Sequence, residues 1–140
     1  MTALKEIVYK LIAPGLRVCL RNSITGKLIR DTHKVLYYDR SQHLGFLFSR
    51  QIEYEKEFSA IIMQHIKPGN LVFEIGSNIG QYSLQIAEKI GENGKLICVE
   101  PDSDNFAYLS FNIIKNGCKN VHLVNEAVAD QQGQTTFYKD

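Results

Sequence analysis

Two glycines and two acids, spaced along a pair of apolar runs, are the residues best suited to bind a ligand. The run Leu71–Ile75 contains Glu74, and Gly76 and Gly80 bracket the short stretch that follows. A second apolar run ends in Glu100, twenty residues after Gly80. A carboxylate at the tip of a strand accepts hydrogen bonds from ribose hydroxyls, and glycine permits a sharp turn beside the ligand. The pattern therefore predicts a nucleoside site.

The glycine spacing separates this pattern from that of dinucleotide-binding proteins. Gly76 and Gly80 give G-x-x-x-G, which lacks the middle glycine that lets backbone approach a pyrophosphate. Glu74 disfavours an anionic phosphate and suits a ligand that carries an ammonium group. A nucleoside joined to an amino acid therefore fits better than a dinucleotide.

A predicted strand, turn and helix position these residues. Residues 71–75 lie between Pro68-Gly69-Asn70 and Gly76, which favours a buried parallel strand. Apolar residues at helical spacing then predict a helix that ends before Gly91. Ligands in open α/β sheets bind where strands end and helices begin. The apolar positions of this helix are Ile79, Ile86, Ala87 and Ile90.

The alternation of strand and helix continues after Glu100. Residues 96–99 form the second predicted strand, and Asp102 and Ser103 offer N-cap oxygens to a helix that Asn116-Gly117 closes. Residues 121–124 predict a third strand, in which His122 projects to the opposite face, and residues 134–138 predict a fourth. The apolar face of the second helix comprises Phe106, Ala107, Leu109, Phe111, Ile113 and Ile114.

Three motifs in this order resemble the FkbM-type family of S-adenosylmethionine-dependent methyltransferases. They are Phe-Glu-Ile-Gly-Ser-Asn-Ile-Gly at 73–80, Val-Glu-Pro-Asp at 99–102 with Asn105, and Asn-Glu-Ala-Val-Ala-Asp at 125–130 with Gly133. The likeness spans about Asn70 to Tyr138, and Ser77 stands where the family often has alanine. The resemblance implies a doubly wound Rossmann-like domain and methyl transfer to a hydroxyl of a sugar, glycan or natural product.

The resemblance also implies that S-adenosyl-L-methionine is the cofactor and indicates which residues bind it. Because the family places its acceptor groups largely beyond the third strand, no catalytic residue is assigned. By this resemblance, the turn residues Gly76, Ser77, Asn78 and Gly80 cradle the methionine moiety, and Glu74 anchors its amino end through the loop. Glu100 binds the ribose hydroxyls, and Glu126 with Ala127 lies along the adenine.

Composition and charge exclude several classes of protein. The chain has 140 residues, 44% hydrophobic and 22% charged, which is enough for one core. Its net charge of +1 and scattered basic residues give no footprint for nucleic acid. The three cysteines, Cys19, Cys98 and Cys118, show no disulfide or zinc spacing, which favours reduced thiols in a cytoplasmic protein without a metal. No segment has the length and hydropathy of a membrane span or signal peptide.

We expect residues 1–50 to form an extension and residues 51–140 the cofactor-binding half of a methyltransferase domain. Residues 1–12 predict an amphipathic helix that docks on the domain or on a neighbouring chain, with a membrane surface as the alternative. Residues 16–38 predict a small β-hairpin or meander with its turn at 22–26. His33 and His43 are expected to be ordinary surface histidines.

Residues 53–57 open a further predicted helix whose acids lie near its N-terminus. Glu53 or Tyr54 could reach the methionine end of the cofactor, although a solvated helix face is the simpler interpretation. The predicted buried stripe of this helix consists of Phe58, Ile61, Ile62 and Ile66.

The order of the elements predicts an uncovered apolar edge on the strand at 71–75, because right-handed connections put the next two strands on one side of it. We therefore expect either a longer protein of which this is the N-terminal part, or another source for the missing cover, including self-association. Two rival functions stay open. One is a non-catalytic remnant or interaction module, and the other is a nicotinamide-dependent oxidoreductase.

Overall fold

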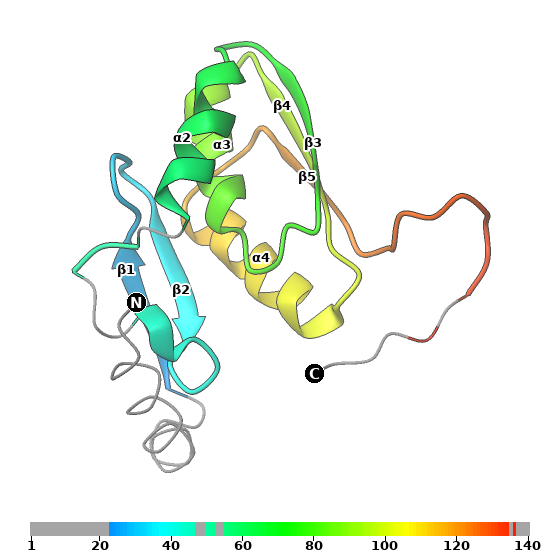
Figure 1. The fold of residues 1–140 in the computed structure, drawn as a ribbon, viewed down its shortest axis with the longest axis horizontal. Helices are drawn as coiled ribbons and strands as arrows, with labels where there is room; N and C mark the ends of the chain where they lie inside the picture. Colours follow the sequence, from blue (N-terminus) through cyan, green and yellow to red (C-terminus); the bar gives the residue numbers. More distant parts are fainter. Residues whose placement is uncertain (1–22, 47–49, 53–54, 135, 137–140) are drawn as a thin grey trace.

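The computed structural model describes residues 23–46, 50–52, 55–134 and 136. Here β1 (Ile24–Leu28) and β2 (Val35–Asp39) form an antiparallel hairpin, followed by a 3₁₀ helix, η1 (Leu44–Phe46). β3 (Leu71–Ile75), β4 (Lys95–Val99) and β5 (Val121–Val124) form a parallel sheet in that order. α2 (Lys56–His65), α3 (Gln81–Ile90) and α4 (Ser103–Lys115) alternate with the sheet strands (Figure 1). The chain thus has the predicted mixed α/β fold.

The core lies on the face of the sheet that the helices cover (Figure 1). Ile86, Ala87 and Ile90 of α3 are buried, because the 3.6-residue period directs them to one side. Ile79, predicted as part of this helix, lies in the turn before it and is buried as well. Gly91 ends α3 with a φ of 67°, and the Asn120 amide donates to the carbonyls of Ala87 and Gly91 at 2.8 Å each. The buried partners on the other elements include Leu96 and Cys98 of β4 and Leu109 and Ile113 of α4.

The hairpin corrects the prediction of a turn at 22–26. Ile24 to Gly26 belong to β1, and the chain reverses instead between Leu28 and Val35. Gly26 faces Tyr37 across the ladder, where a built Cβ would lie 2.8 Å from the tyrosine ring. A glycine inside a strand marks such a close approach, so here it reports packing rather than a turn. The β-forming residues before Tyr38 are correctly assigned to a strand.

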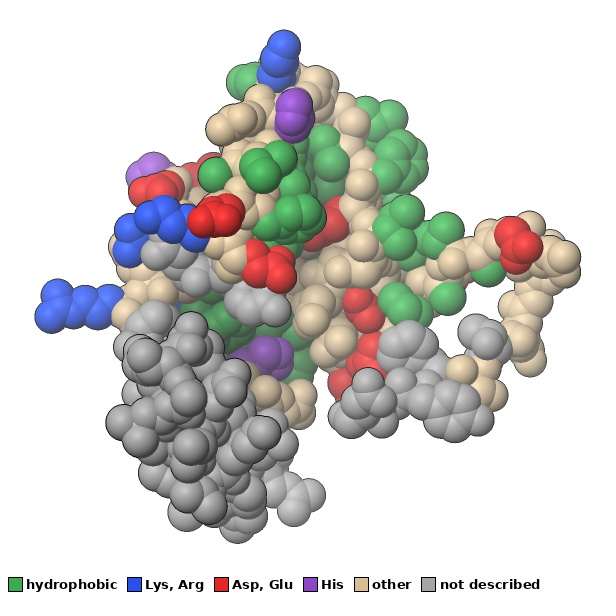
Figure 2. All heavy atoms as spheres, in the orientation of Figure 1, with side chains coloured by type: hydrophobic (Ala, Val, Ile, Leu, Met, Phe, Trp, Pro, Cys, Tyr) green, Lys and Arg blue, Asp and Glu red, His purple; other side chains and the backbone are tan. Residues whose placement is uncertain are grey.

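The other face of the parallel sheet exposes apolar side chains. Leu71, Phe73 and Ile75 are 59%, 63% and 66% exposed, and in the described part of the chain β3 pairs only with β4. Figure 2 shows hydrophobic side chains on the side of the sheet away from the helices. The predicted uncovered edge of β3 is therefore present, and the expectation of a buried strand is wrong for the face that carries these three side chains.

The predicted helix faces are wider than their buried parts. Of the stripe predicted for α2, Phe58 and Ile61 are mostly exposed, Ile62 is half-buried and Ile66, just after the helix, is buried. Phe58 meets the ring of Tyr82 edge-on, with 6.1 Å between the ring centroids. In α4, Phe111 and Ile114 are also exposed. Each helix contacts neighbours over only part of its circumference, so an apolar residue at the margin of the stripe stays in solvent.

Several predictions fall on residues that are not described. The helix at 1–12, the strand-like alternation at 16–21 and the pair Glu53 and Tyr54 lie outside the described ranges. Of the predicted strand at 134–138, Gln134 and Thr136 are described and belong to no strand, while the others lie outside. The division of the chain at residue 50 stays a prediction.

Candidate functional site

The turn between β3 and α3 is built from backbone hydrogen bonds to the neighbouring strand. The N–H groups of Gly76 and Ser77 both donate to the carbonyl of Val99 at the end of β4, at 2.8 and 3.1 Å. The Gly80 N–H donates to the Ser77 carbonyl at 2.9 Å. Gly76, Asn78 and Gly80 have φ angles of 77°, 50° and 93°. Glycine and asparagine are the residues that tolerate such angles, which explains their place in the motif.

The two glycines serve different purposes. A Cβ built on Gly80 would lie 2.8 Å from Leu109 Cδ1, so Gly80 lets the turn pack against α4. Gly76 is exposed, and a Cβ built there meets no atom within 4 Å. The turn therefore presents open space at Gly76, beside the N-terminus of α3.

The carboxylate of Glu100 joins the turn to the start of α4. Its Oε2 accepts from the Asn78 N–H at 2.7 Å and its Oε1 accepts from the Asp102 N–H at 2.9 Å. Glu100 is only 5% exposed, so these charge-assisted bonds are largely shielded from water. Asp102 in turn caps α4 as predicted, accepting from the N–H groups of Asp104 and Asn105 at 2.9 Å each. The sequence did not predict that Glu100 organises the turn.

Glu74 points to the covered side of the sheet, beneath the turn. Its Oε2 accepts from Ser83 Oγ at 2.6 Å and from Cys98 Sγ at 3.4 Å. Burial raises the pKa of the Glu74 carboxyl above its ordinary value, and the bonds from Ser83, Cys98 and Ser77 oppose this rise. Burial and the nearby Glu74 raise the pKa of the Cys98 thiol to about 12, so this thiol stays protonated and is no nucleophile.

The last predicted pair, Glu126 and Ala127, follows β5 in an exposed, irregular segment. The preceding Asn125 donates through Nδ2 to the carbonyl of Glu100 at 2.7 Å and to that of Pro101 at 3.3 Å. This side chain ties the end of β5 to the end of β4. The first two motifs and Asn125, the first residue of the third, therefore lie together at the carboxyl ends of the three parallel strands.

Asn112 was missed by the sequence analysis. Its side chain is fully buried in α4 and donates to the carbonyl of Ile79 in the turn at 2.8 Å. The available signal was a pair of asparagines, Asn112 and Asn116, four residues apart beside the apolar positions of the helix. Buried polar side chains need partners, so an asparagine there predicts a specific contact.

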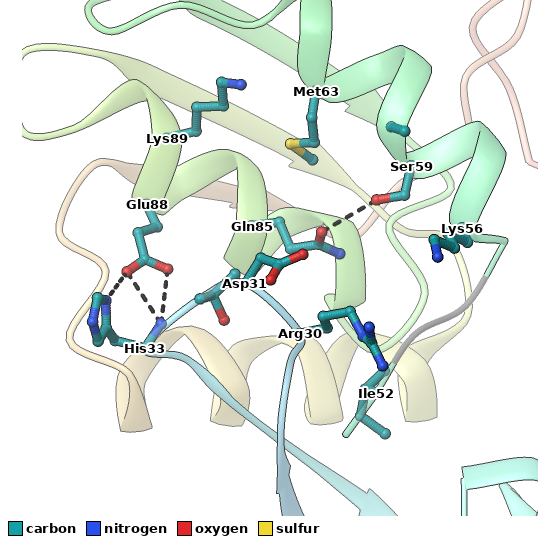
Figure 3. A pocket seen from close by; sticks show the side chains of 12 residues that line it. Arg30, Asp31, His33, Ile52, Lys56, Ser59, Met63, Gln85, Glu88 and Lys89 are labelled. Carbon is teal, nitrogen blue, oxygen red and sulfur yellow. Dashed lines mark hydrogen bonds and ion pairs between the residues drawn. The ribbon is translucent and has the colours of Figure 1, made fainter. Parts of the chain in front are cut away.

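A separate cavity of about 640 Å³ lies between the hairpin turn, α2 and α3 (Figure 3). It borders the C-terminal half of α3, away from the glycine turn. His33 Nδ1 lies 2.8 Å from Glu88 Oε1, and Ser59 Oγ donates to Gln85 Oε1 at 3.2 Å (Figure 3). The lining carries both basic and acidic side chains.

The described residues contain neither a metal-binding cluster nor a membrane-spanning helix. No group of three or more histidine, cysteine, aspartate or glutamate side chains could hold a metal ion there. None of the described helices is long and apolar enough to cross a membrane.

The fold is that of known methyltransferase structures. TYW2 of P. horikoshii, solved in complex with MeSAdo, matches with a TM-score of 0.58 and 21% identity over 81% of this chain and 39% of its own. A protein-L-isoaspartate O-methyltransferase matches with a TM-score of 0.51 and 23% identity over 54% of this chain and 24% of its own. A protein from Clostridium thermocellum described as an rRNA-methylase matches with a TM-score of 0.50 and 18% identity, over 55% and 42%.

The sequence by itself matches no protein-family model and no curated protein. The chain spans less than half the length of each of these three solved proteins. These likenesses show that the chain has the Rossmann-like fold of S-adenosylmethionine-dependent methyltransferases.

Proposed function

We propose that this chain is the cofactor-binding part of an S-adenosylmethionine-dependent methyltransferase. The observation that carries the proposal is the bond of 2.7 Å from the Asn78 N–H to Glu100 Oε2, which brings the glycine turn and the strand-tip acid together. In open α/β sheets, ligands bind in the crevice outside the carboxyl ends of the strands. The fold of the solved methyltransferases supports the same assignment.

The residues at this edge fit the parts of the cofactor. The open space at Gly76 accommodates the methionine moiety against the turn of Ser77, Asn78 and Gly80. Glu100 keeps acceptor capacity for ribose hydroxyls, because a carboxylate has about four lone-pair sites and two are used. Glu126 and Ala127, in the exposed segment after β5, border the adenine, and Glu74 favours the ammonium end from beneath the turn.

S-Adenosylmethionine supplies the electrophilic methyl group, so the protein contributes mainly orientation. Holding two reactants in line is worth up to about 7–11 kcal/mol in favourable cases. The hydrogen-bonded turn and the buried Glu100 are suited to this task because they are rigidly connected to β4 and α4. A hydroxyl acceptor also needs a general base, for which no residue of this chain is assigned.

The finer proposal follows the FkbM-type resemblance: O-methylation of a sugar, glycan or natural-product hydroxyl by a cytoplasmic enzyme. Residues 51–140 would be its cofactor-binding half and residues 1–50 an extension, with the acceptor groups elsewhere in a longer protein. The net charge of +1 favours a small-molecule or glycan acceptor over nucleic acid. Because one structural neighbour is described as an rRNA-methylase, RNA belongs among the acceptors tested.

Cofactor selectivity separates this proposal from its rivals. We would titrate the chain with S-adenosylhomocysteine and with NAD by isothermal calorimetry. Binding of S-adenosylhomocysteine at least tenfold tighter than NAD supports the methyltransferase. The reverse order would indicate a nicotinamide-dependent oxidoreductase, and binding of neither nucleotide would leave a non-catalytic interaction module. The acceptor is then sought by transfer of a labelled methyl group to glycan, small hydroxyl compound or RNA fractions.

A further inference from the structure

Asn112 of α4 and Asn116, the C-cap residue of that helix, bind the edge of β2 that faces away from β1. Asn112 Oδ1 accepts from the Tyr37 N–H at 2.7 Å, and Asn112 Nδ2 donates to the Tyr37 carbonyl at 2.9 Å. Asn116 repeats the arrangement on Val35, accepting from its N–H and donating to its carbonyl at 2.8 Å each. Each side-chain amide thus occupies both backbone groups of one residue of β2.

The match has a geometric reason. Residues four apart on a helix are separated by about 6 Å along its axis. Residues two apart on a strand are separated by about 6.6 Å. The amides of Asn112 and Asn116 therefore repeat at the interval of Val35 and Tyr37, and α4 takes the place of a neighbouring strand. β1 occupies the other edge of β2, so the hairpin is held from both sides.

Each asparagine makes a third hydrogen bond, and only that of Asn112 reaches the glycine turn. Its second amide hydrogen is donated to the Ile79 carbonyl at 2.8 Å, while the corresponding hydrogen of Asn116 goes to the Asn112 carbonyl of the same helix at 2.8 Å. Ile79 lies between Asn78, whose N–H is held by Glu100, and Gly80, which packs on Leu109. One buried amide thus bonds the hairpin and the turn together.

We propose that Asn112 is a positioning residue that couples the hairpin β1–β2 to the cofactor turn. The side chain uses its oxygen and both amide hydrogens, so the turn cannot shift at Ile79 without breaking this set. The hairpin fixes the amide from one side, and the amide fixes the turn on the other. The inference rests on the proposed function insofar as this turn binds S-adenosylmethionine.

The chain contains a matched control for this inference. Asn112→Asp keeps the acceptor for the Tyr37 N–H and loses two bonds to carbonyls, one of them in the turn. Asn116→Asp keeps the acceptor for the Val35 N–H and also loses two bonds to carbonyls, neither of them in the turn. Asn112 is fully buried and Asn116 is half-buried, so the two variants also differ in the cost of burying a carboxylate. A difference at the turn that exceeds the difference in global stability between the variants therefore reports the contact with Ile79.

The first readout is hydrogen exchange of the Gly80 N–H without ligand, since this group bonds to Ser77 within the turn. We expect exchange at least tenfold faster in Asn112→Asp than in Asn116→Asp. The second readout is the Kd of S-adenosylhomocysteine, which should rise at least tenfold in Asn112→Asp and less than threefold in Asn116→Asp. Equal effects of the two variants on both readouts would overturn the coupling.

Wild-type protein provides an independent test if Asn112→Asp does not fold. Saturation with S-adenosylhomocysteine should slow exchange of the Tyr37 N–H, held by Asn112, at least threefold more than that of the Val35 N–H, held by Asn116. Equal slowing at both sites would refute the inference. If wild type binds no S-adenosylhomocysteine, the proposed function fails, and exchange at Gly80 alone decides whether Asn112 positions the turn.

Discussion

Replacing Glu100 by alanine should destabilise the chain as well as weaken cofactor binding. The carboxylate accepts from the Asn78 N–H at 2.7 Å and from the Asp102 N–H at 2.9 Å, in a site that is only 5% exposed. A hydrogen bond to a charged group contributes about 1.5–3 kcal/mol, so losing both costs about 3–6 kcal/mol. This is a large share of the 5–15 kcal/mol or so by which domains are typically stable.

Urea unfolding followed by circular dichroism measures this loss directly. Glu100→Gln keeps one acceptor oxygen and turns an amide group toward the other N–H, so its loss should lie between that of Glu100→Ala and zero. Glu92→Ala, an exposed acid before β4, is the control and should change stability by less than about 0.5 kcal/mol. The reasoning is refuted if Glu100→Ala is as stable as Glu92→Ala.

The same substitution tests the proposed ribose contact. Under conditions where Glu100→Ala stays folded, its affinity for S-adenosylmethionine should be at least tenfold weaker, since both the direct acceptor and the anchored turn are lost. If calorimetry on the protein expressed from the complete reading frame shows that Glu100→Ala binds S-adenosylmethionine as tightly as wild type, the ribose assignment is excluded.

Three further perturbations address the turn, the buried acid and the sheet edge. Gly76→Val should abolish binding of S-adenosylhomocysteine in calorimetry, because a β-branched residue resists a φ of 77° and fills the open space. Glu74→Gln should flatten the pH dependence of the melting temperature. With the folded pKa raised above the ordinary 4.5, wild-type stability falls as pH rises from about 4.5 through the folded pKa, since the native state then holds more protons than the unfolded state. The chain should self-associate through its exposed sheet, and Phe73→Lys should reduce this in analytical ultracentrifugation.

Matched controls make these results specific. Gly69 precedes β3, at the end opposite to Gly76, and also has a positive φ, 81°, with open space around it. Gly69→Val therefore imposes a similar backbone strain and should leave binding intact. Glu57→Gln removes an exposed acid and should not alter the pH dependence of wild type. Ile114→Lys removes an apolar group of α4 that is even more exposed, 76% against 63% for Phe73, and should not alter self-association. Loss of binding in Gly69→Val, an unchanged pH slope in Glu74→Gln, or a monodisperse wild type would each count against the corresponding argument.

The alternating elements from Leu71 onward could be predicted because their signals are local. The helical spacing of Ile86 to Ile90, the cap at Asp102 and the stop at Gly91 are each satisfied within a few residues, and the structure confirms them. Ile79, the first position of the predicted helix, instead lies in the turn before α3. Spacing also brought Gly76, Gly80 and Glu100 to one edge of the sheet, because parallel strands end on the same side.

What could not be predicted depends on partners distant in sequence. In the sequence Gly26 resembles a turn residue, whereas in the structure it lies in a strand where the ring of Tyr37 leaves no room for a side chain. Phe58 and Ile114 resemble core residues because an apolar stripe gives no measure of how much of it a neighbour covers. Asn112 bonds to residues 75 and 33 positions away, and no local pattern identifies those carbonyls. The sequence assigned Glu100 to the ligand. Its bonds to the N–H groups of Asn78 and Asp102 could not be predicted, because they depend on the conformation of the turn.

The central claim is that the turn at Gly76–Gly80 is the cofactor site, and a nuclear magnetic resonance titration tests it most directly. On adding S-adenosylhomocysteine to ¹⁵N-labelled protein, we predict the largest amide shifts at Gly76–Gly80, Asp102 and Asn125–Ala127. Shifts confined to Arg30–His33 and the facing side of α2, which line the cavity of Figure 3, would contradict the account, as would no shift at saturating ligand.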